Sequence, residues 1–325
     1  MRIHPPLKVL VDAQNKLGEG IVGSFNDDNS GTIAWVDIDK QEVHLLRLNA
    51  QGIAESHRHK QVDAQITWGA VEAGQNFAFF ARDTVLYYGA HSLKKFDEQS
   101  FHIPDCPENH RTNDGRMHHS GHYWFGTMAA DDPTNNATSG GIYYSVSGMP
   151  AKLIFPGIRI PNAICFSPSG ERMYFTDSPT RIISRFPVDP ATGAPAMEFN
   201  PNAWKDKNSP LRRSMVFIDL DDHLAHIPES SHPDGAITHA DGSIFLALAC
   251  LDFDQPSSAV ARFSPAGKLT DLYPVPTPVV TCPFIDVHGY LYATSAQLNM
   301  TKEQLGNNPT AGALWRTPYP VVSAE

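Results

Sequence analysis

Six short strand-like runs, each led by a glycine, recur along the chain at a nearly regular interval. They begin at Gly31, Gly74, Gly121, Gly170, Gly242 and Gly289, which gives spacings of 43, 47, 49, 72 and 47 residues. A period in the forties built from strand-type sequence is typical of propeller blades. The interval of 72 residues corresponds to one ordinary repeat plus an insertion of roughly 25 residues, because insertions in repeat proteins fall in loops. The sequence therefore predicts an all-β fold, a six-bladed β-propeller with a central channel.

Further strand-like runs accompany each glycine-led strand, and no segment shows a long 3.6-residue periodicity. We expect residues 1–325 to form a single domain, one closed ring. An early strand, Lys8-Val-Leu-Val-Asp12, is expected to pair with the last blade and leave no long free edge. The insertion, about residues 190–224, contains Ser214-Met-Val-Phe-Ile-Asp219, which resembles the outer strand of the fourth blade. The rest of the insertion is expected to be a loop on one face.

Composition narrows the classes of partner. The chain carries 25 basic and 35 acidic residues, a net charge of −10, which disfavours nucleic acid and anionic membranes as partners. No stretch approaches the roughly 18–20 apolar residues of a membrane span. The four cysteines (Cys106, Cys165, Cys250 and Cys282) form no C-x-x-C pair, which disfavours a zinc ribbon or a redox dithiol. We expect a soluble, cytoplasmic protein, with a monomer as the default.

Oxygen-bearing side chains recur at one position of the repeat. Counting back eight residues from the repeat glycines gives Asn113, Asn162 and Asp234, together with Thr281 and Ile66, and the matching position of the longer first repeat is Glu19. Equivalent positions on the innermost strands of a propeller lie at one height and face the channel. We therefore expect Glu19, Asn113, Asn162 and Asp234 to converge, although they are far apart in the sequence.

Two carboxylates and two amide oxygens suit one hard divalent cation. Ca²⁺ is the first expectation, with Zn²⁺, Mg²⁺ and Mn²⁺ as alternatives. Each of these residues taken singly is also a common turn former, so four unrelated turns are the competing interpretation. Their recurrence at one position of the repeat favours a shared site. A zinc site at His118 and His122 is disfavoured, because residues four apart meet on a helix and this stretch resembles strand and turn.

Four motifs surround the same positions. They are Leu17-Gly-Glu-Gly20 followed by Ala34-Trp-Val-Asp-Ile38; Arg111-Thr-Asn-Asp-Gly115 continuing to Gly126-Thr-Met128; Ile160-Pro-Asn162 with Phe166-Ser-Pro168 and Tyr174-Phe-Thr-Asp-Ser178; and Pro233-Asp-Gly235. In combination they resemble the regucalcin/gluconolactonase (senescence marker protein) family of six-bladed propellers. The resemblance spans about residues 10–315.

The resemblance implies a role for each matching residue. Glu19, Asn162 and Asp234 would be the metal ligands. Arg111 and Asn113 would contact the substrate, and Asn113 is a further candidate for the metal. Asp131 stands where some members have a substrate-contacting glutamate, and it is the third candidate substrate contact.

The resemblance also implies an activity, the hydrolysis of sugar lactones to aldonic acids. A metal-bound site of this kind polarises the lactone carbonyl, and Asp234 is the candidate that accepts the proton of the attacking water. Arg111 would orient the sugar hydroxyls or the ring oxygen; a salt bridge at the channel rim is its alternative role. Loops at residues 131–139 and 190–230 are expected to distinguish one lactone from another. The alternatives are a phosphotriesterase-type hydrolase and a non-enzymatic calcium-binding regulatory protein.

Two departures from the family pattern stand out. Ala163 follows Asn162, where a glycine is usual, and the insertion before Pro233 is longer than usual.

Overall fold

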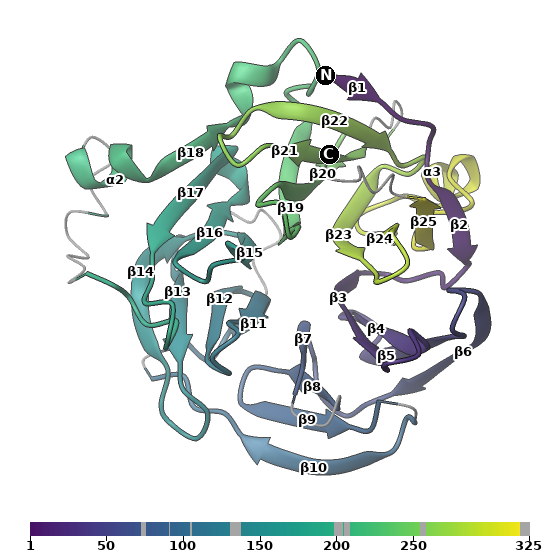
Figure 1. Cartoon of the computed structure of the whole chain (residues 1–325), viewed down its shortest axis with the longest axis horizontal. Coiled ribbons are helices and arrows are strands. Elements are labelled where there is room, and N and C mark those ends of the chain that lie inside the picture. The colour runs from purple at the N-terminus through teal and green to yellow at the C-terminus, as the bar shows by residue number, and fades with distance from the viewer. Residues whose placement is uncertain are drawn as a thin grey trace.

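The computed structural model describes residues 1–72, 76–90, 92–104, 106–130, 138–197, 204, 209–253 and 258–318. Its strands form six sheets arranged around a central axis (Figure 1). The six-bladed β-propeller expected from the glycine-led repeat is confirmed.

The first three blades follow one another along the chain. Blade 1 contains β3 (Gly18–Phe25), β4 (Gly31–Asp37), β5 (Glu42–Leu48) and β6 (Ala54–Gln61). Blade 2 contains β7 (Trp68–Val71), β8 (Phe77–Phe80), β9 (Thr84–Tyr88) and β10 (Lys95–Ser100). Blade 3 contains β11 (His110–Met117), β12 (Tyr123–Ala129), β13 (Gly140–Ser145) and β14 (Lys152–Ile158).

The last three blades repeat this order from the inside outward. Blade 4 contains β15 (Pro161–Phe166), β16 (Arg172–Asp177), β17 (Ile182–Pro187) and β18 (Val216–Asp219). Blade 5 contains β19 (Ser231–Thr238), β20 (Ile244–Cys250), β21 (Ala259–Phe263) and β22 (Leu269–Pro274). Blade 6 contains β23 (Val279–Ile285), β24 (Tyr290–Ala296) and β25 (Leu314–Pro318).

The beginning of the chain joins the last two blades. Strand β2 (Lys8–Val11) pairs antiparallel with β25, with Lys8 opposite Arg316, which confirms the expected ring closure. Strand β1 (Arg2–Ile3) adds to the outer edge of blade 5 by pairing parallel with β22. Two of the outer blade edges are therefore covered by the same short segment.

The core is divided among the blade interfaces. The described residues contain six clusters of buried apolar side chains, and each cluster draws its main strand residues from two neighbouring blades. The second strands β4, β12 and β20 are buried at every position because they pack against a blade on each side. The outer strand β10 is exposed at every position. This packing fixes the inner strands relative to one another, and so fixes the channel wall.

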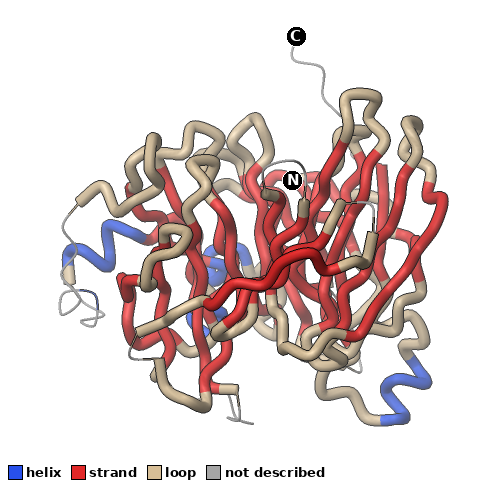
Figure 2. The backbone as a smooth tube through the Cα atoms, turned by 90° about the horizontal axis from the view of Figure 1, so that it is seen from below, coloured by secondary structure: helices blue, strands red, loops and turns tan. Residues whose placement is uncertain are grey.

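Short helices lie outside the blades, and the sequence analysis did not predict them. They are α2 (Pro210–Met215), α3 (Lys302–Asn307) and the 3₁₀ turns η2 (Ser178–Thr180) and η3 (Leu220–His223). Figure 2 shows α3 at the lower face of the strand ring. Helices of six residues are too short to show a periodicity. None of the helices in the described part of the chain has the length and apolar character needed to cross a bilayer.

Candidate active site

The inner strands share an irregularity that places the candidate residues. The register shifts between Glu19 and Val22 in β3, Thr112 and Gly115 in β11, Asn162 and Cys165 in β15, Pro233 and Ala236 in β19, and Val280 and Pro283 in β23. At each shift two residues of the inner strand face one residue of the second strand, which is a β-bulge. Bulges re-aim a side chain and interrupt pairing, and they are frequent at active sites. Glu19, Asn113, Asn162 and Asp234 all lie in these bulges or directly before them.

Two of the bulges use the left-handed backbone region. Gly20 has φ 59° and Ala163 has φ 56°, and they directly follow Glu19 and Asn162. A Cβ on Gly20 would lie 2.7 Å from the Cα of Trp68, so this position has neither the backbone freedom nor the space for a side chain. Ala163 adopts the same conformation with a Cβ, which is unfavourable for an L-residue. The departure from glycine seen in the sequence is therefore a point of backbone strain.

We expect Ala163→Gly to stabilise the protein by about 0.5–1 kcal/mol, since relief of the left-handed strain exceeds the added flexibility of the unfolded chain. Urea unfolding measures this difference. Ala261→Gly is a matched control, because Ala261 is also fully buried in a strand and has no positive φ. The control should lose about 0.5–1 kcal/mol. Equal losses in both variants would contradict the assignment of strain to Ala163.

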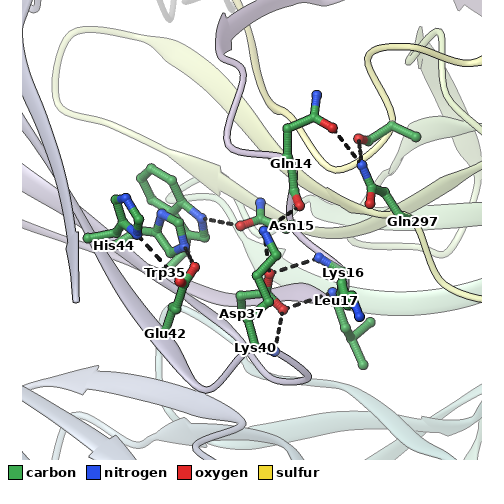
Figure 3. A network of polar contacts seen from close by, with 12 residues as sticks. Gln14, Asn15, Lys16, Leu17, Trp35, Asp37, Lys40, Glu42, His44 and Gln297 are labelled. Carbon is green, nitrogen blue, oxygen red and sulfur yellow. Dashed lines mark hydrogen bonds and ion pairs between the residues drawn. The ribbon is translucent and has the colours of Figure 1, made fainter. Parts of the chain in front are cut away.

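Aspartates at the ends of two second strands fix the backbone just before two of these residues. Asp37, at the end of β4, accepts hydrogen bonds from the N–H groups of Lys16 (2.8 Å) and Leu17 (3.1 Å), shortly before Glu19 (Figure 3). Asp177, at the end of β16, accepts from the N–H groups of Arg159 (3.2 Å) and Ile160 (3.0 Å), shortly before Asn162. Asp177 therefore stabilises the bend that leads into β15.

The carboxyls of Glu19 and Asp234 interact inside the channel. Burial raises the pKa of Glu19 well above its ordinary value, and the charges of Asp234 and Asp114 raise it further. Burial also raises the pKa of Asp234, with the charge of Asp114 as the next cause. Two neighbouring carboxyls in such a site, once ionised, provide the negative charge that a divalent cation neutralises.

One oxygen of Asp234 supports this interpretation directly. Its Oδ1 atom is buried and has no hydrogen-bond partner among the described residues. Buried polar atoms in proteins are nearly always paired, and an orphaned carboxylate oxygen calls for a ligand. The donor set of Glu19, Asn162 and Asp234 therefore fits a hard divalent cation.

The raised pKa values predict a pH dependence of stability in the metal-free protein. Glu19 and Asp234 bind protons more tightly in the folded chain than in the unfolded chain, so stability should fall as the pH rises through their folded pKa values. Added Ca²⁺ should reverse this loss by neutralising the ionised pair. Thermal unfolding between about pH 5 and pH 8, with EDTA or with Ca²⁺, tests the prediction. A metal-free stability that rises across this range would contradict it.

A chain of side-chain hydrogen bonds orients Asn162. Arg111 Nη1 donates to Asn113 Oδ1 (2.6 Å), Asn113 Nδ2 donates to Asn162 Oδ1 (2.9 Å), and Asn162 Nδ2 donates to Ser178 Oγ (3.0 Å). Asn113 Nδ2 also donates to the carbonyl oxygen of Pro161 (2.9 Å). In this orientation Asn113 presents its amide nitrogen to Asn162. The geometry favours a role in positioning Asn162 over direct contact between Asn113 and a cation.

Arg111 lies beside the acidic side chains. The charges of Asp39, Glu19 and Asp234 favour its charged form, while burial lowers its pKa. Its hydrogen bonds to protein use only Nη1, which donates to Asn113 and to the carbonyl oxygen of Thr112 (2.9 Å). Nε and Nη2 thus remain available among the described residues to donate to a ligand. No ion pair of Arg111 occurs in the described part of the chain, so the alternative of a salt bridge at the rim is not supported.

Asp114 and Arg116 join several inner strands, and Arg116 was not predicted from the sequence. Asp114 accepts from the N–H of Gly115 (2.8 Å) and from that of Ile164 in β15 (2.8 Å). Arg116 donates to the carbonyl oxygens of Ile164 (3.3 Å) and Ala236 (3.1 Å), and approaches Cys282 Sγ at 3.9 Å. These bonds connect β11 with β15, β19 and β23. A basic residue three positions after Asn113, on an inner strand, was the available signal.

Two of the other positions found by counting are structural. Thr281 donates to the carbonyl oxygen of Gly18 (2.5 Å) and contacts Thr294 Oγ1 (2.8 Å), so its hydroxyl is satisfied by protein. Ile66 is fully buried in the apolar core. Asp131 lies outside the described residues, and its expected contact with substrate stays a prediction.

The histidines after β11 have protein partners. His118 contacts Ser120 Oγ (2.9 Å) and the carbonyl oxygen of Gly170 (3.1 Å), and His122 contacts the hydroxyl of Tyr144 (2.5 Å). Such pairing agrees with the interpretation that these histidines are not a zinc site.

The first part of the insertion lies away from the candidate site. Residues just after the end of β11 hold it, since His119 Nε2 contacts the carbonyl oxygen of Pro190 (2.7 Å) and Ser120 Oγ donates to that of Thr192 (2.9 Å). The candidate ligands lie at the opposite end or middle of the inner strands. The expectation that the loop at residues 190–230 distinguishes the substrate is therefore wrong for its first residues. They follow the end of β17, which lies at the face of the ring opposite to the start of β15, where Asn162 lies. The predicted outer strand is confirmed as β18.

Comparison with known proteins agrees with this geometry. Residues 17–297 match the family described as the SMP-30/Gluconolactonase/LRE-like region. The chain belongs to this family. The resemblance drawn from the four motifs is thereby confirmed.

Relatives of this chain include proteins named as lactone hydrolases, in line with the expected enzyme class. The chain is 31% identical to a Rhizobium meliloti (strain 1021) protein named provisionally as a sugar lactone lactonase, covering 94% of this chain and 90% of the relative. It is 29% identical to the L-arabinolactonase of Azospirillum brasilense, covering 97% and 93%. Among solved structures, a calcium-binding protein, regucalcin, from Agrobacterium tumefaciens superposes with a TM-score of 0.75 at 28% identity, covering 97% of this chain and 94% of the other.

Proposed function

We propose that this protein hydrolyses a sugar lactone to the aldonic acid, with one divalent cation held by Glu19, Asn162 and Asp234. The observation that carries the proposal is the buried, unpaired Oδ1 of Asp234 beside the carboxyl of Glu19. The lactonase names of the relatives support the reaction class. Ca²⁺ is the expected ion, because the ligands are all oxygens. Zn²⁺, Mg²⁺ and Mn²⁺ are the alternatives.

The cation, when bound, would polarise the lactone carbonyl and stabilise negative charge on its oxygen. Asp234 would accept the proton of the attacking water at a carboxylate oxygen, which requires the ionised form that a nearby positive charge favours. Asn113 would hold the amide oxygen of Asn162 toward the ligand set. Arg111 would donate from Nε and Nη2 to the ring oxygen or hydroxyls of the sugar. Asp131 remains a candidate for a further substrate contact. We expect a cytoplasmic monomer that acts without nucleic acid or membrane.

A panel of aldonolactones assayed by acid release, with and without EDTA, tests the proposal. We expect turnover of at least one sugar lactone, its loss with EDTA and its return with Ca²⁺. A fluorophosphate belongs in the same panel. Turnover of that ester alone would support a phosphotriesterase instead, and tight Ca²⁺ binding without any turnover would support a regulatory protein. Lactone turnover that EDTA does not change would contradict the role of the cation.

A further inference from the structure

A second group of potential ligands lies on the outer part of blade 1, away from the channel. Strands β5 and β6 carry the sequences Glu42-Val-His44 and His57-Arg-His59. Alternate residues of a strand point to the same face of its sheet. His44 is directly opposite His59 in the β5–β6 register. One face of this hairpin therefore gathers Glu42 and three imidazoles.

The distances within the group are close to those of a metal site. One ligand atom each from Glu42, His44 and His59 lies within 4.8 Å of the others. Glu42 Oε2 is 3.5 Å from His44 Nε2, and Glu42 Oε1 is 3.5 Å from His59 Nδ1. The side chain of His59 is 56% exposed and that of Glu42 is 16% exposed, so both have freedom to close around an ion.

His44 is fixed in place with one nitrogen unused. It is 1% exposed, it stacks on Trp35 at 4.8 Å between ring centroids, and it stacks on His59 at 5.3 Å. His44 Nδ1 is 3.1 Å from His57 Nε2, whereas its buried Nε2 has no hydrogen-bond partner among the described residues. With the proton on Nδ1 and shared with His57, Nε2 carries a lone pair directed at the group. A second partner that fixes the tautomer of a histidine is typical of metal ligands.

The local charges leave this position open to a cation. Lys40, a cationic side chain whose charge acts on His44, donates to the carbonyl oxygen of Gln14 (2.7 Å) and lies 3.8 Å from Asp37. Figure 3 shows Glu42 and His44 next to Trp35 and Asp37. The positive charge of Lys40 is therefore drawn toward Asp37, and Glu42 remains the carboxylate of the histidine group.

We propose that Glu42, His44 and His59 form a second metal site, selective for a divalent transition metal such as Zn²⁺. Two imidazoles and one carboxylate are a ligand set that Zn²⁺ accepts, with water in the fourth position. Imidazole ligands favour Zn²⁺, Ni²⁺ and Cu²⁺ over Ca²⁺, in contrast to the oxygen ligands in the channel. This site goes beyond the proposed lactonase activity and does not depend on it.

A metal at this position would link the two outermost strands of blade 1. Strand β6 forms the edge of its sheet, and every residue except His57 is exposed. Binding an ion only in the folded state stabilises that state by mass action. Zn²⁺ should therefore raise the midpoint of thermal unfolding, and this rise should vanish in His59→Ala.

Calorimetric titration of the whole protein with Zn²⁺, in the presence of saturating Ca²⁺, tests the proposal. Ca²⁺ keeps the oxygen ligands of the channel occupied. We expect one Zn²⁺ per chain at the outer site, and at least a tenfold loss of affinity in His59→Ala and in Glu42→Gln. His102→Ala is the matched control, because His102 is an exposed histidine outside the group. It should bind Zn²⁺ like the unchanged protein.

A spectroscopic measurement locates the ion. Trp35 stacks on His44, so Cu²⁺ bound at the group should quench part of the tryptophan fluorescence, and His59→Ala should abolish that part. Lactone turnover should be unchanged in His59→Ala, which separates this site from the proposed active site. Equal Zn²⁺ binding and equal quenching in His59→Ala, Glu42→Gln and His102→Ala would overturn the proposal.

Discussion

Asp234→Ala will abolish lactone turnover, with a fall in kcat of at least about 10²–10⁴-fold, the contribution of a positioned general base. Loss of a metal ligand adds to this effect. The reason is structural: Asp234 supplies both a carboxylate close to Glu19 and the buried Oδ1 that has no protein partner. The expected measurements are kcat from acid release and Ca²⁺ affinity from calorimetry. Both should fall together.

Two control variants test whether the loss of turnover is specific to the carboxylate of Asp234. Asp97→Ala removes an exposed carboxylate on the outer strand β10 and should leave turnover unchanged. Asp234→Asn keeps the shape of the side chain but removes one of the two buried charges. Its metal-free form should be at least as stable as the unchanged protein, since repulsion with Glu19 is relieved, while Ca²⁺ should no longer raise its unfolding midpoint. Near-normal turnover in Asp234→Ala would refute the assignment.

Arg116→Met should destabilise the protein by about 3–5 kcal/mol, the range for breaking a buried, hydrogen-bonded charge pair. Arg116 donates to the carbonyl oxygens of Ile164 and Ala236. Burial raises the pKa of Asp114, and the charge of Arg116 opposes that rise by favouring the ionised form. Methionine fills similar space but leaves both oxygens unpaired and Asp114 without its cation. Denaturant unfolding measures the loss.

The control for Arg116 is an arginine on the surface. Arg47→Met removes a side chain that is 62% exposed and that pairs, among the residues the structure describes, with Glu55 alone at 3.4 Å. Exposed pairs contribute about 0–1 kcal/mol, so this variant should change stability little. A loss below about 1 kcal/mol in Arg116→Met would show that the bonds across the channel do not hold the inner strands together.

The fold could be predicted because the repeat is a property of the sequence itself. A period in the forties specifies blades, and the early strand at Lys8 supplies the piece that the last blade lacks. The convergence of Glu19 and Asp234 could be predicted for the same reason, since equal positions in the repeat occupy equal heights in the ring. The short helices α2 and α3 were missed because six residues show no periodicity, although the capping box of Thr301 and Gln304 was a signal for α3 in the sequence.

Other features of the site depend on contacts between blades. The bulges arise from the register of an inner strand against its neighbour, and no single residue in the sequence predicts them. Ala163 is an example, since only its φ shows why glycine is favoured there. Arg116 acts across the channel on strands that follow it by about 50 to 170 residues, and the group around His44 depends on the pairing of β5 with β6. Such contacts are set by three-dimensional packing.

The most direct test of the proposed mechanism is a Ca²⁺ titration of metal-free protein that records bound Ca²⁺ and lactone turnover together. Ca²⁺ suits the oxygen ligands of the channel and not the histidine group on blade 1. Turnover should rise in proportion to bound ion and saturate at one Ca²⁺ per chain. Full turnover before any Ca²⁺ is bound, in the presence of chelator, would contradict catalysis by a cation held at Glu19, Asn162 and Asp234.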